Sequence, residues 1–401
     1  MCKKKGVTIV NDGFIKTKTQ QKIMKKLKAV TPQFAKREHE LTEKGSFPFE
    51  NIQDLKDIGY TSISLPKEFG GEEISLYDFL LFQEQIARGC GSTALSIGWH
   101  VGIVMDLAEN RTWEPTMFSY ICEQVKKGAL LNRAATERQT GSPTRGGKPA
   151  TSASRDKGGW SISGRKTFTT MSPVLDYFLV TASIEGTDEV GEFLIPKTVE
   201  GVSIEETWDS VAMRGTASHD LVMHEVKIPQ EYLVEKKIPG KSSAKNSGWL
   251  LHIPACYLGI ATAARNYCLD FAAHYQPNSL KHPIGQLPTV EQAIGKMELE
   301  LMQARHFLYS VAEKYDSATD RNELKPELAA AKYIVTNSAI SIVDHAMRIV
   351  GARSLSEANP LQRYYLNVRA GLHNPPMDDS TLSLLANHAL KTANEKPFVS
   401  F

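Results

Sequence analysis

The spacing of apolar residues changes its period twice along the chain. Between about residues 17 and 124, apolar residues recur at three- and four-residue steps, which predicts amphipathic helices. Between Ala129 and about Pro229 the period shortens to two, which predicts short β-strands. After Gly240 the helical period returns and continues for the rest of the chain.

These zones predict an α+β fold of three domains. Glycine- and proline-containing turns separate the short strands, so the middle zone is expected to form a compact, antiparallel β domain inserted between two helical parts. The long amphipathic helices of the last zone predict a four-helix bundle. The expected boundaries are an N-terminal helical domain over 1–126, a middle β domain over 127–240 and the bundle over 241–401.

Composition narrows the classes of function. Hydrophobic residues make up 41% of the 401 residues, charged residues 23%, and the formal net charge is +2, so nucleic acid is not an expected partner. The five cysteines form no CxxC pair, which argues against a metal site and a disulfide framework. No apolar run reaches the roughly 18 residues that cross a bilayer, so we expect no membrane association and a cytoplasmic location.

Three polar segments interrupt the β zone. The first, Thr-Glu-Arg-Gln-Thr-Gly-Ser over 136–142, ends in a small turn whose N–H groups and hydroxyls suit a phosphate or a flavin edge, although a plain hairpin loop has similar residues. The second, over 164–170, is a glycine turn that leads into an aromatic residue and two threonines. The third, over 213–218, contains Arg214, whose guanidinium group suits an anionic or carbonyl-bearing ligand.

The order of the domains, together with these three segments, resembles acyl-CoA dehydrogenases over nearly the whole chain. The resemblance implies FAD as cofactor, with Phe168 flanking the isoalloxazine ring and Thr170 hydrogen-bonded to it. Pro143 stands where the family usually has an aspartate. The β-domain residues expected to bind the cofactor are Thr136, Gly141, Ser142, Phe168, Thr169 and Thr170, and those expected to bind substrate are Arg214 and Ser218.

Three further cofactor residues are implied in the bundle. Lys281 and Gln292 have the spacing of a family segment that reaches the FAD of a neighbouring subunit, and Gly351 lies in the place of a glycine-rich turn near the pyrophosphate. A homodimer, commonly doubled to a homotetramer, is therefore expected. Lys281 replaces an arginine and Ile284 a phenylalanine, which weakens adenine recognition and keeps FMN as a second possibility behind FAD.

The expected catalytic glutamate is missing. Alignment from Gly351 onward puts Asn374 in its place, and an amide is not a proton acceptor near neutral pH. Some relatives carry the glutamate at the start of the bundle, but residues 248–254 hold no carboxylate. His373 and Asp378 are the candidate bases near Asn374, with Asp379 beside them; a polar wall for the histidine and a helix cap for the aspartates are the alternatives.

Three functions remain open. The first is α,β-dehydrogenation of an acyl-CoA thioester, with electrons passing to FAD and then to an acceptor such as an electron-transferring flavoprotein. The second is a flavin-dependent monooxygenase acting on a sulfur or aromatic compound, because Leu-His-Asn-Pro over 372–375 is similar to a segment of such enzymes whose histidine helps form a C4a-hydroperoxyflavin. The third is a non-catalytic flavin-binding relative, which the presence of Phe168 and Thr170 argues against.

Overall fold

The N-terminal region is helical, as the sequence predicts. The computed structural model describes residues 12–41, 46–141, 147–237 and 248–394. Helix α4 is buried over nearly all its length and therefore lies at the centre of the molecule rather than on its surface. The helices of this region are α1 (Lys18–Glu40), α2 (Phe49–Asp57), α3 (Leu76–Gly89), α4 (Gly91–Asn110) and α5 (Pro115–Lys126).

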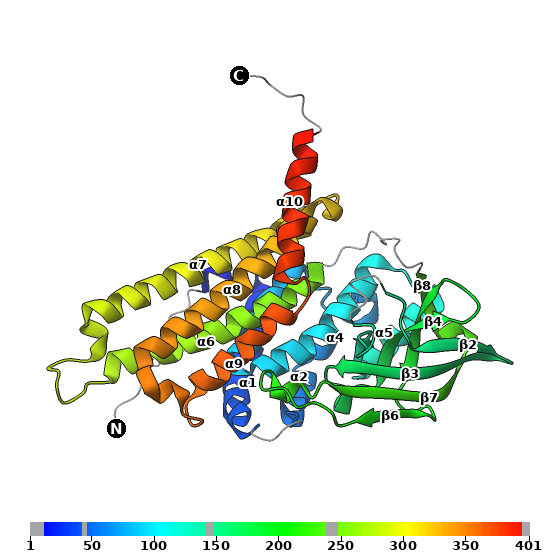
Figure 1. Cartoon of the computed structure of the whole chain (residues 1–401), viewed down its shortest axis with the longest axis horizontal. Coiled ribbons are helices and arrows are strands. Elements are labelled where there is room, and N and C mark those ends of the chain that lie inside the picture. The colour runs from blue at the N-terminus through cyan, green and yellow to red at the C-terminus, as the bar shows by residue number, and fades with distance from the viewer. Residues whose placement is uncertain (1–11, 42–45, 142–146, 238–247, 395–401) are drawn as a thin grey trace.

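The middle region is a single sheet in the order β6-β7-β3-β2-β4-β5-β8, with β1 paired to β4 (Figure 1). Most neighbours are antiparallel, but β1–β4 and β2–β4 are parallel pairs, which the period of two could not distinguish. The strands are β1 (Leu131–Ala134), β2 (Ser152–Asp156), β3 (Gly159–Thr169), β4 (Tyr177–Ile184), β5 (Val190–Pro196), β6 (Val202–Glu205), β7 (His219–Pro229) and β8 (Leu233–Lys237).

Strand β4 departs from the simple alternation. All four residues from Tyr177 to Val180 are buried, so both faces of the strand are covered at this point. One cover is α5, since the Tyr120 hydroxyl lies 2.8 Å from that of Tyr177. A strand enclosed on both faces lies inside the protein. Because β1 pairs with β4, β1 lies beside this buried strand.

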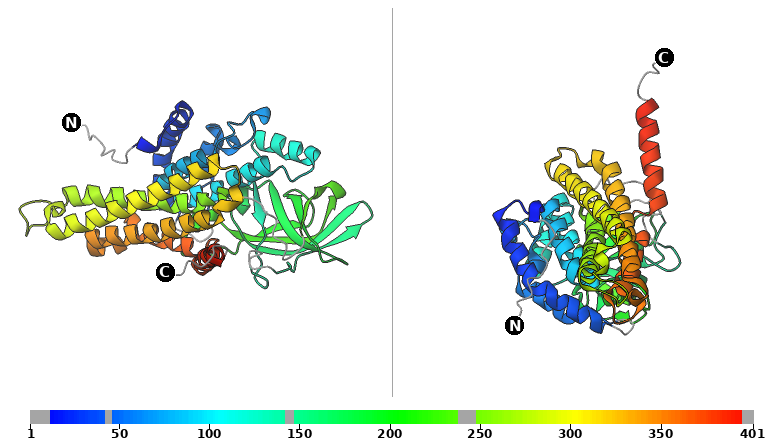
Figure 2. Two further views of the ribbon diagram at one scale, coloured as in Figure 1. Left: turned by 90° about the horizontal axis from the view of Figure 1, so that it is seen from above. Right: turned by 90° about the vertical axis from the view of Figure 1, so that its left-hand side faces the viewer.

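The last region is a bundle. Helices α6 (His252–His274), α7 (Pro288–Ser317) and α8 (Lys325–Val350) lie side by side, with α9 (Pro360–Arg369) along them, while α10 (Asp378–Asn394) stands away from the body (Figures 1 and 2). The predicted α+β fold of helical domain, β domain and helical bundle is confirmed. Among the described residues, no helix is long and apolar enough to span a membrane.

Candidate functional site

A buried ion pair holds the turn that carries Thr136 and Gly141. Lys166 Nζ donates to Glu137 Oε1 at 2.6 Å, and both side chains are almost fully enclosed. Glu137 also accepts from the Thr140 and Thr151 hydroxyls and from the Ala150 and Thr151 N–H groups. Burial alone would raise the pKa of Glu137, but the hydrogen bonds from Lys166 and Thr151 lower it to about 2. The turn is thus rigidly positioned.

A chain of hydroxyl groups joins two segments that are far apart in sequence. Thr170 Oγ1 lies 2.9 Å from Ser218 Oγ, which lies 2.8 Å from Thr216 Oγ1. The Thr216 hydroxyl donates to the Met213 carbonyl, so it accepts from Ser218, and Ser218 in turn accepts from Thr170. Asn132 donates to the Thr170 carbonyl at 2.9 Å. The structure therefore brings together Thr170, expected to bind the cofactor, and Ser218, expected to bind substrate, a contact that the sequence did not predict.

Three residues of the predicted cofactor group are still able to contact a ligand: Phe168, Thr169 and Gly141. Phe168 has φ +57° and is 59% exposed, and its ring meets that of Trp208 edge-to-face with centroids 5.8 Å apart. The buried Thr169 hydroxyl has no hydrogen-bond partner within the described ranges. Gly141 has φ +71°, and a Cβ added there would meet no atom within 4 Å. Ser142 lies outside the described residues.

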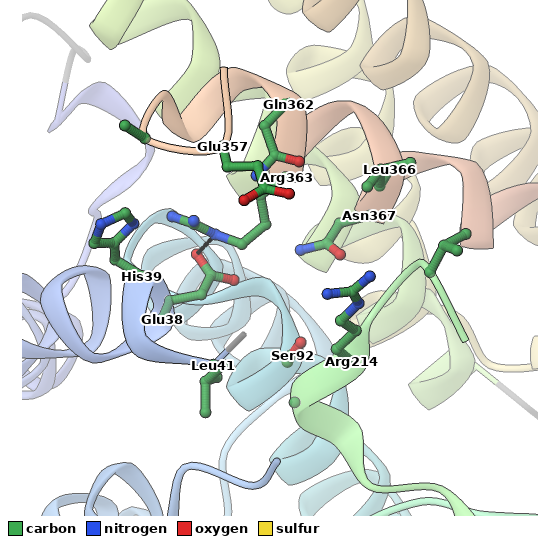
Figure 3. Close-up of a pocket in the computed structure, with 13 residues that line it drawn as sticks. Glu38, His39, Leu41, Ser92, Arg214, Glu357, Gln362, Arg363, Leu366 and Asn367 are labelled. Carbon is green, nitrogen blue, oxygen red and sulfur yellow. Dashed lines mark ion pairs between the residues drawn. The ribbon is translucent and has the colours of Figure 1, made fainter. Parts of the chain in front are cut away.

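Arg214 lines a cavity of about 420 Å³ where the three domains meet. The cavity is bounded by α1, α4, the turn at Arg214 and α9, and the Arg214 side chain lies beside Asn367 (Figure 3). Asn367 accepts the Met213 N–H at 2.8 Å, which ties α9 to the turn. Burial raises the pKa of Glu38, whose carboxylate lies 3.3 Å from Arg363 across the same cavity.

The connection from α6 to α7, the start of α7 and the end of α8 lie at the end of the bundle that points away from the sheet (Figures 1 and 2). By their positions in the chain, Lys281, Gln292 and Gly351 belong to these segments. Arg353, in the turn that begins at Gly351, lies over the Tyr275 ring at 4.3 Å, so this turn adjoins the segment that leads to Lys281. The predicted cofactor residues therefore form two separate groups.

The three candidate catalytic residues have different surroundings. His373 is exposed. Asn374 Oδ1 accepts the Tyr257 hydroxyl at 2.5 Å. Asp378 lies 3.3 Å from the Nζ of buried Lys332 and accepts from Asn337 Nδ2 at 3.0 Å, at the first turn of α10. These contacts favour Asp378 as an anchor for α10 and leave His373 as the candidate free to contact a ligand.

Comparison with known proteins decides the family. Profiles of the acyl-CoA dehydrogenase N-terminal, middle and C-terminal domains match residues 17–112, 132–226 and 251–372. YdbM of Bacillus subtilis (strain 168), which carries a provisional name as an acyl-CoA dehydrogenase, is 54% identical over 379 residues, or 94% of this chain and 99% of its own. The chain belongs to the acyl-CoA dehydrogenase family.

Solved structures share the whole fold of this acyl-CoA dehydrogenase family chain. Butyryl-CoA dehydrogenase from Megasphaera elsdenii superposes with a TM-score of 0.82 at 20% identity, covering 94% of this chain and 99% of its own. KijD3, in complex with FMN and a dTDP-linked amino sugar, gives 0.83 at 23% identity and 94% coverage of each chain. At such identities the likeness extends to the fold alone.

Sequence reasoning missed one side chain of the bundle in this family member. His252, the first residue of α6, is fully buried, and neither ring nitrogen has a hydrogen-bond partner among the described residues. Burial lowers the pKa of His252 to about 3, so the imidazole is neutral. In the sequence, His252 is the one ionisable residue in the run Trp-Leu-Leu-His-Ile-Pro over 249–254. An ionisable residue within an apolar run is the feature that could have identified it.

Proposed function

We propose that the protein is a flavin-dependent oxidoreductase that removes two hydrogens from the α- and β-carbons of an acyl-CoA thioester. The observation that carries the proposal is the meeting of Thr170 and Ser218 beside the exposed Phe168. Two segments separated in sequence thus build one polar face with an aromatic flank. Such a face suits a planar heterocycle, because hydroxyls can bond its edge while the ring packs on its side.

The described residues fit FAD. Gly141 leaves room for close approach of a ligand, the Thr169 hydroxyl lacks a partner, and the Glu137–Lys166 pair holds the intervening turn in place. The flavin, when bound, would accept a hydride from the β-carbon. The protein would have to orient the thioester, exclude water and receive the α-proton. FMN is the less favoured cofactor.

A second copy of the chain would complete the site. Lys281, Gln292 and Gly351 belong to segments at the end of the bundle that points away from the sheet, so we propose that they serve a cofactor held by the partner chain (Figure 1). Helix α10 supports the same conclusion: it is 17 residues long, projects from the body and exposes Leu382, Leu384 and Leu390. An isolated helix of this length is marginally stable in water, so a partner surface is expected. We propose a homodimer, which could double to a homotetramer.

The residue that accepts the α-proton is a further part of the proposal. Asn374 cannot accept the α-proton, since its amide is not basic and its oxygen already accepts from Tyr257. Asp378 is engaged with Lys332 and Asn337. His373, exposed beside Asn374, is our candidate for the proton acceptor. Electrons would leave for a separate acceptor, such as an electron-transferring flavoprotein, in the cytoplasm and within fatty acid metabolism.

One observation favours a second function. The position of the expected glutamate holds Asn374, preceded by His373 and followed by Pro375, a pattern similar to flavin-dependent monooxygenases on the same fold. In that case the substrate would be a sulfur or aromatic compound and oxygen a co-substrate. Loss of catalysis with retention of flavin is the third possibility.

The direct test is product analysis. Flavin-loaded protein is incubated with saturated acyl-CoA thioesters and an artificial electron acceptor, and the masses of the products are measured by mass spectrometry. A product lighter by two hydrogens supports the dehydrogenase, whereas one heavier by an oxygen, formed only in air with a reductant, supports the monooxygenase. Purified protein that holds no flavin and binds none on addition contradicts both enzyme functions.

A further inference from the structure

His252 is a buried polar group without an evident structural purpose. Both ring nitrogens are enclosed and lack hydrogen-bond partners among the described residues. A neutral imidazole has one N–H donor and one acceptor, and leaving them unpaired in the interior costs free energy. Buried groups of this kind are normally satisfied by protein, water or ligand.

Aromatic side chains surround the imidazole. Trp249 lies parallel to it with ring centroids 6.0 Å apart, Trp99 meets it edge-on at 5.0 Å, and Phe79 lies 5.8 Å away. A phenylalanine at position 252 would retain these ring contacts and would leave no orphaned nitrogen. Packing alone therefore does not explain a histidine here.

The Nδ1 edge faces a crowded part of the interior. A Cβ added at Gly98 would come within 2.3 Å of His252 Nδ1 and 2.1 Å of Gln83 Nε2, so only glycine fits between the helices. Gln83 is already engaged, because its Nε2 donates to the Ala94 carbonyl and its Oε1 accepts from Tyr60. Of the three aromatic neighbours, Trp99 is partly exposed while Phe79 and Trp249 are buried. Of these three rings, Trp99 is therefore the one that reaches toward the surface.

The same cluster adjoins the hydroxyl chain of the candidate site. Trp249 lies 5.9 Å from the Arg133 guanidinium on β1. The next residue along that strand, Asn132, donates to the Thr170 carbonyl. The β1 strand is also held against α4, since the Leu131 N–H donates to His100 Nδ1 at 3.1 Å. A molecule bound at Thr170 thus lies across β1 from the His252 cluster.

Resting on the function proposed above, we propose that His252 is a specificity-determining residue that hydrogen-bonds an oxygen in the acyl part of the thioester. A hydroxyl group can pair with either ring nitrogen, and a carbonyl with the N–H. The preferred substrate class is therefore an acyl-CoA that carries a hydroxyl or keto oxygen. An unsubstituted acyl chain would leave the imidazole unpaired, and the preference follows from that difference.

The test compares butyryl-CoA with 3-hydroxybutyryl-CoA, by anaerobic isothermal titration calorimetry on the flavin-loaded protein. The wild type is expected to bind the hydroxylated thioester about threefold to tenfold more tightly, the ratio that one net hydrogen bond supplies. In His252→Phe the two thioesters should bind equally, and Tm should be unchanged or higher. His252→Gln, which retains a donor and an acceptor, should keep part of the preference.

Phe79→Leu is the matched control, because it trims the same cluster without removing a polar group. It should lower Tm and leave the preference intact. Equal binding by the wild type, or a preference that survives in His252→Phe, would overturn the role of His252; so would a large fall in Tm in His252→Phe, which would mean that the nitrogens have a partner within the folded protein. Failure of both thioesters, and of longer acyl-CoA thioesters, to bind the wild type would instead overturn the proposed function itself.

Discussion

The two walls of the candidate site are built differently. The β-domain wall is held by an internal network of hydrogen bonds: Glu137 accepts five of them, and Thr170, Ser218 and Thr216 form a continuous chain. The Thr169 hydroxyl of this wall has no partner among the described residues. In the bundle wall, His373 is exposed, and His252 is buried with no hydrogen-bond partner in the described part of the chain.

This difference separates cofactor binding from substrate chemistry. A fully bonded wall is rigid and changes little when a ligand binds, which suits a cofactor that stays in place. Groups without protein partners retain their hydrogen-bonding capacity for a substrate. We infer that the β-domain wall preserves the flavin site of the acyl-CoA dehydrogenase family, while the bundle wall is where this chain departs from it, at Asn374.

The largest expected effect comes from breaking the β-domain wall. Lys166→Met should reduce the free energy of unfolding by about 3–5 kcal/mol, because it leaves the Glu137 carboxylate buried and unpaired. Flavin should be lost with it. Urea unfolding measures the change, and Lys148→Met, which removes the exposed pair with Asp188, is the control with an expected change of about 0.5 kcal/mol or less. A cost for Lys166→Met as small as the control's would contradict the rigid-wall interpretation.

Removing the candidate base His373 should slow catalysis without weakening the β-domain wall. His373→Ala should slow flavin reduction by an acyl-CoA about 100-fold or more, the usual contribution of a positioned base. Flavin content and Tm should stay unchanged, since the side chain is exposed. Stopped-flow absorbance measures the rate. Reduction at the wild-type rate would remove His373 from the mechanism and leave Asp378 and Asp379 to be tested.

The assignment of the two cofactor groups to different subunits can be tested by complementation. Thr170→Ala and Lys281→Ala should each lose flavin occupancy. Co-expression should restore about a quarter of the sites, since half of randomly formed dimers are mixed and each has one intact site. If each site were built within one chain, the mixture would show no recovery of bound flavin.

Asp378→Asn should have a smaller effect and sharpen the division of roles. The asparagine amide still offers an oxygen to the buried Lys332 ammonium group, so loss of the carboxylate charge should cost about 1–3 kcal/mol, measured by thermal unfolding. Flavin reduction should proceed at the wild-type rate. A fall comparable to that of His373→Ala would return Asp378 to the list of candidate bases.

The internal bonds of the β-domain wall also predict a dependence of stability on acid pH. The folded pKa of Glu137 is about 2, below its ordinary value of 4.5, so its stabilising contribution is complete above about pH 4.5 and is lost as pH falls toward 2. In Glu137→Gln this part of the acid dependence should disappear. An unchanged slope of stability against pH between 4.5 and 2 would contradict the assigned hydrogen bonds.

The fold could be predicted from the sequence because its period changes are long and each domain follows one period. The parallel pairing of β1 and β2 with β4 could not be predicted, because the alternation of apolar and polar residues is the same in parallel and antiparallel strands. The resemblance identified Thr170 and Ser218 separately, but their contact depends on how β3 and β7 end in space. His252 escaped notice because burial and the absence of a partner are tertiary properties.

The most direct test of the central claim is an anaerobic visible spectrum of the flavin-loaded protein, recorded before and after addition of a panel of acyl-CoA thioesters. The proposed dehydrogenase predicts that at least one thioester bleaches the bound flavin without any other reductant. A flavin that stays oxidised with every thioester, yet turns over oxygen once reduced by another donor, would contradict the claim and assign the fold to oxygen chemistry.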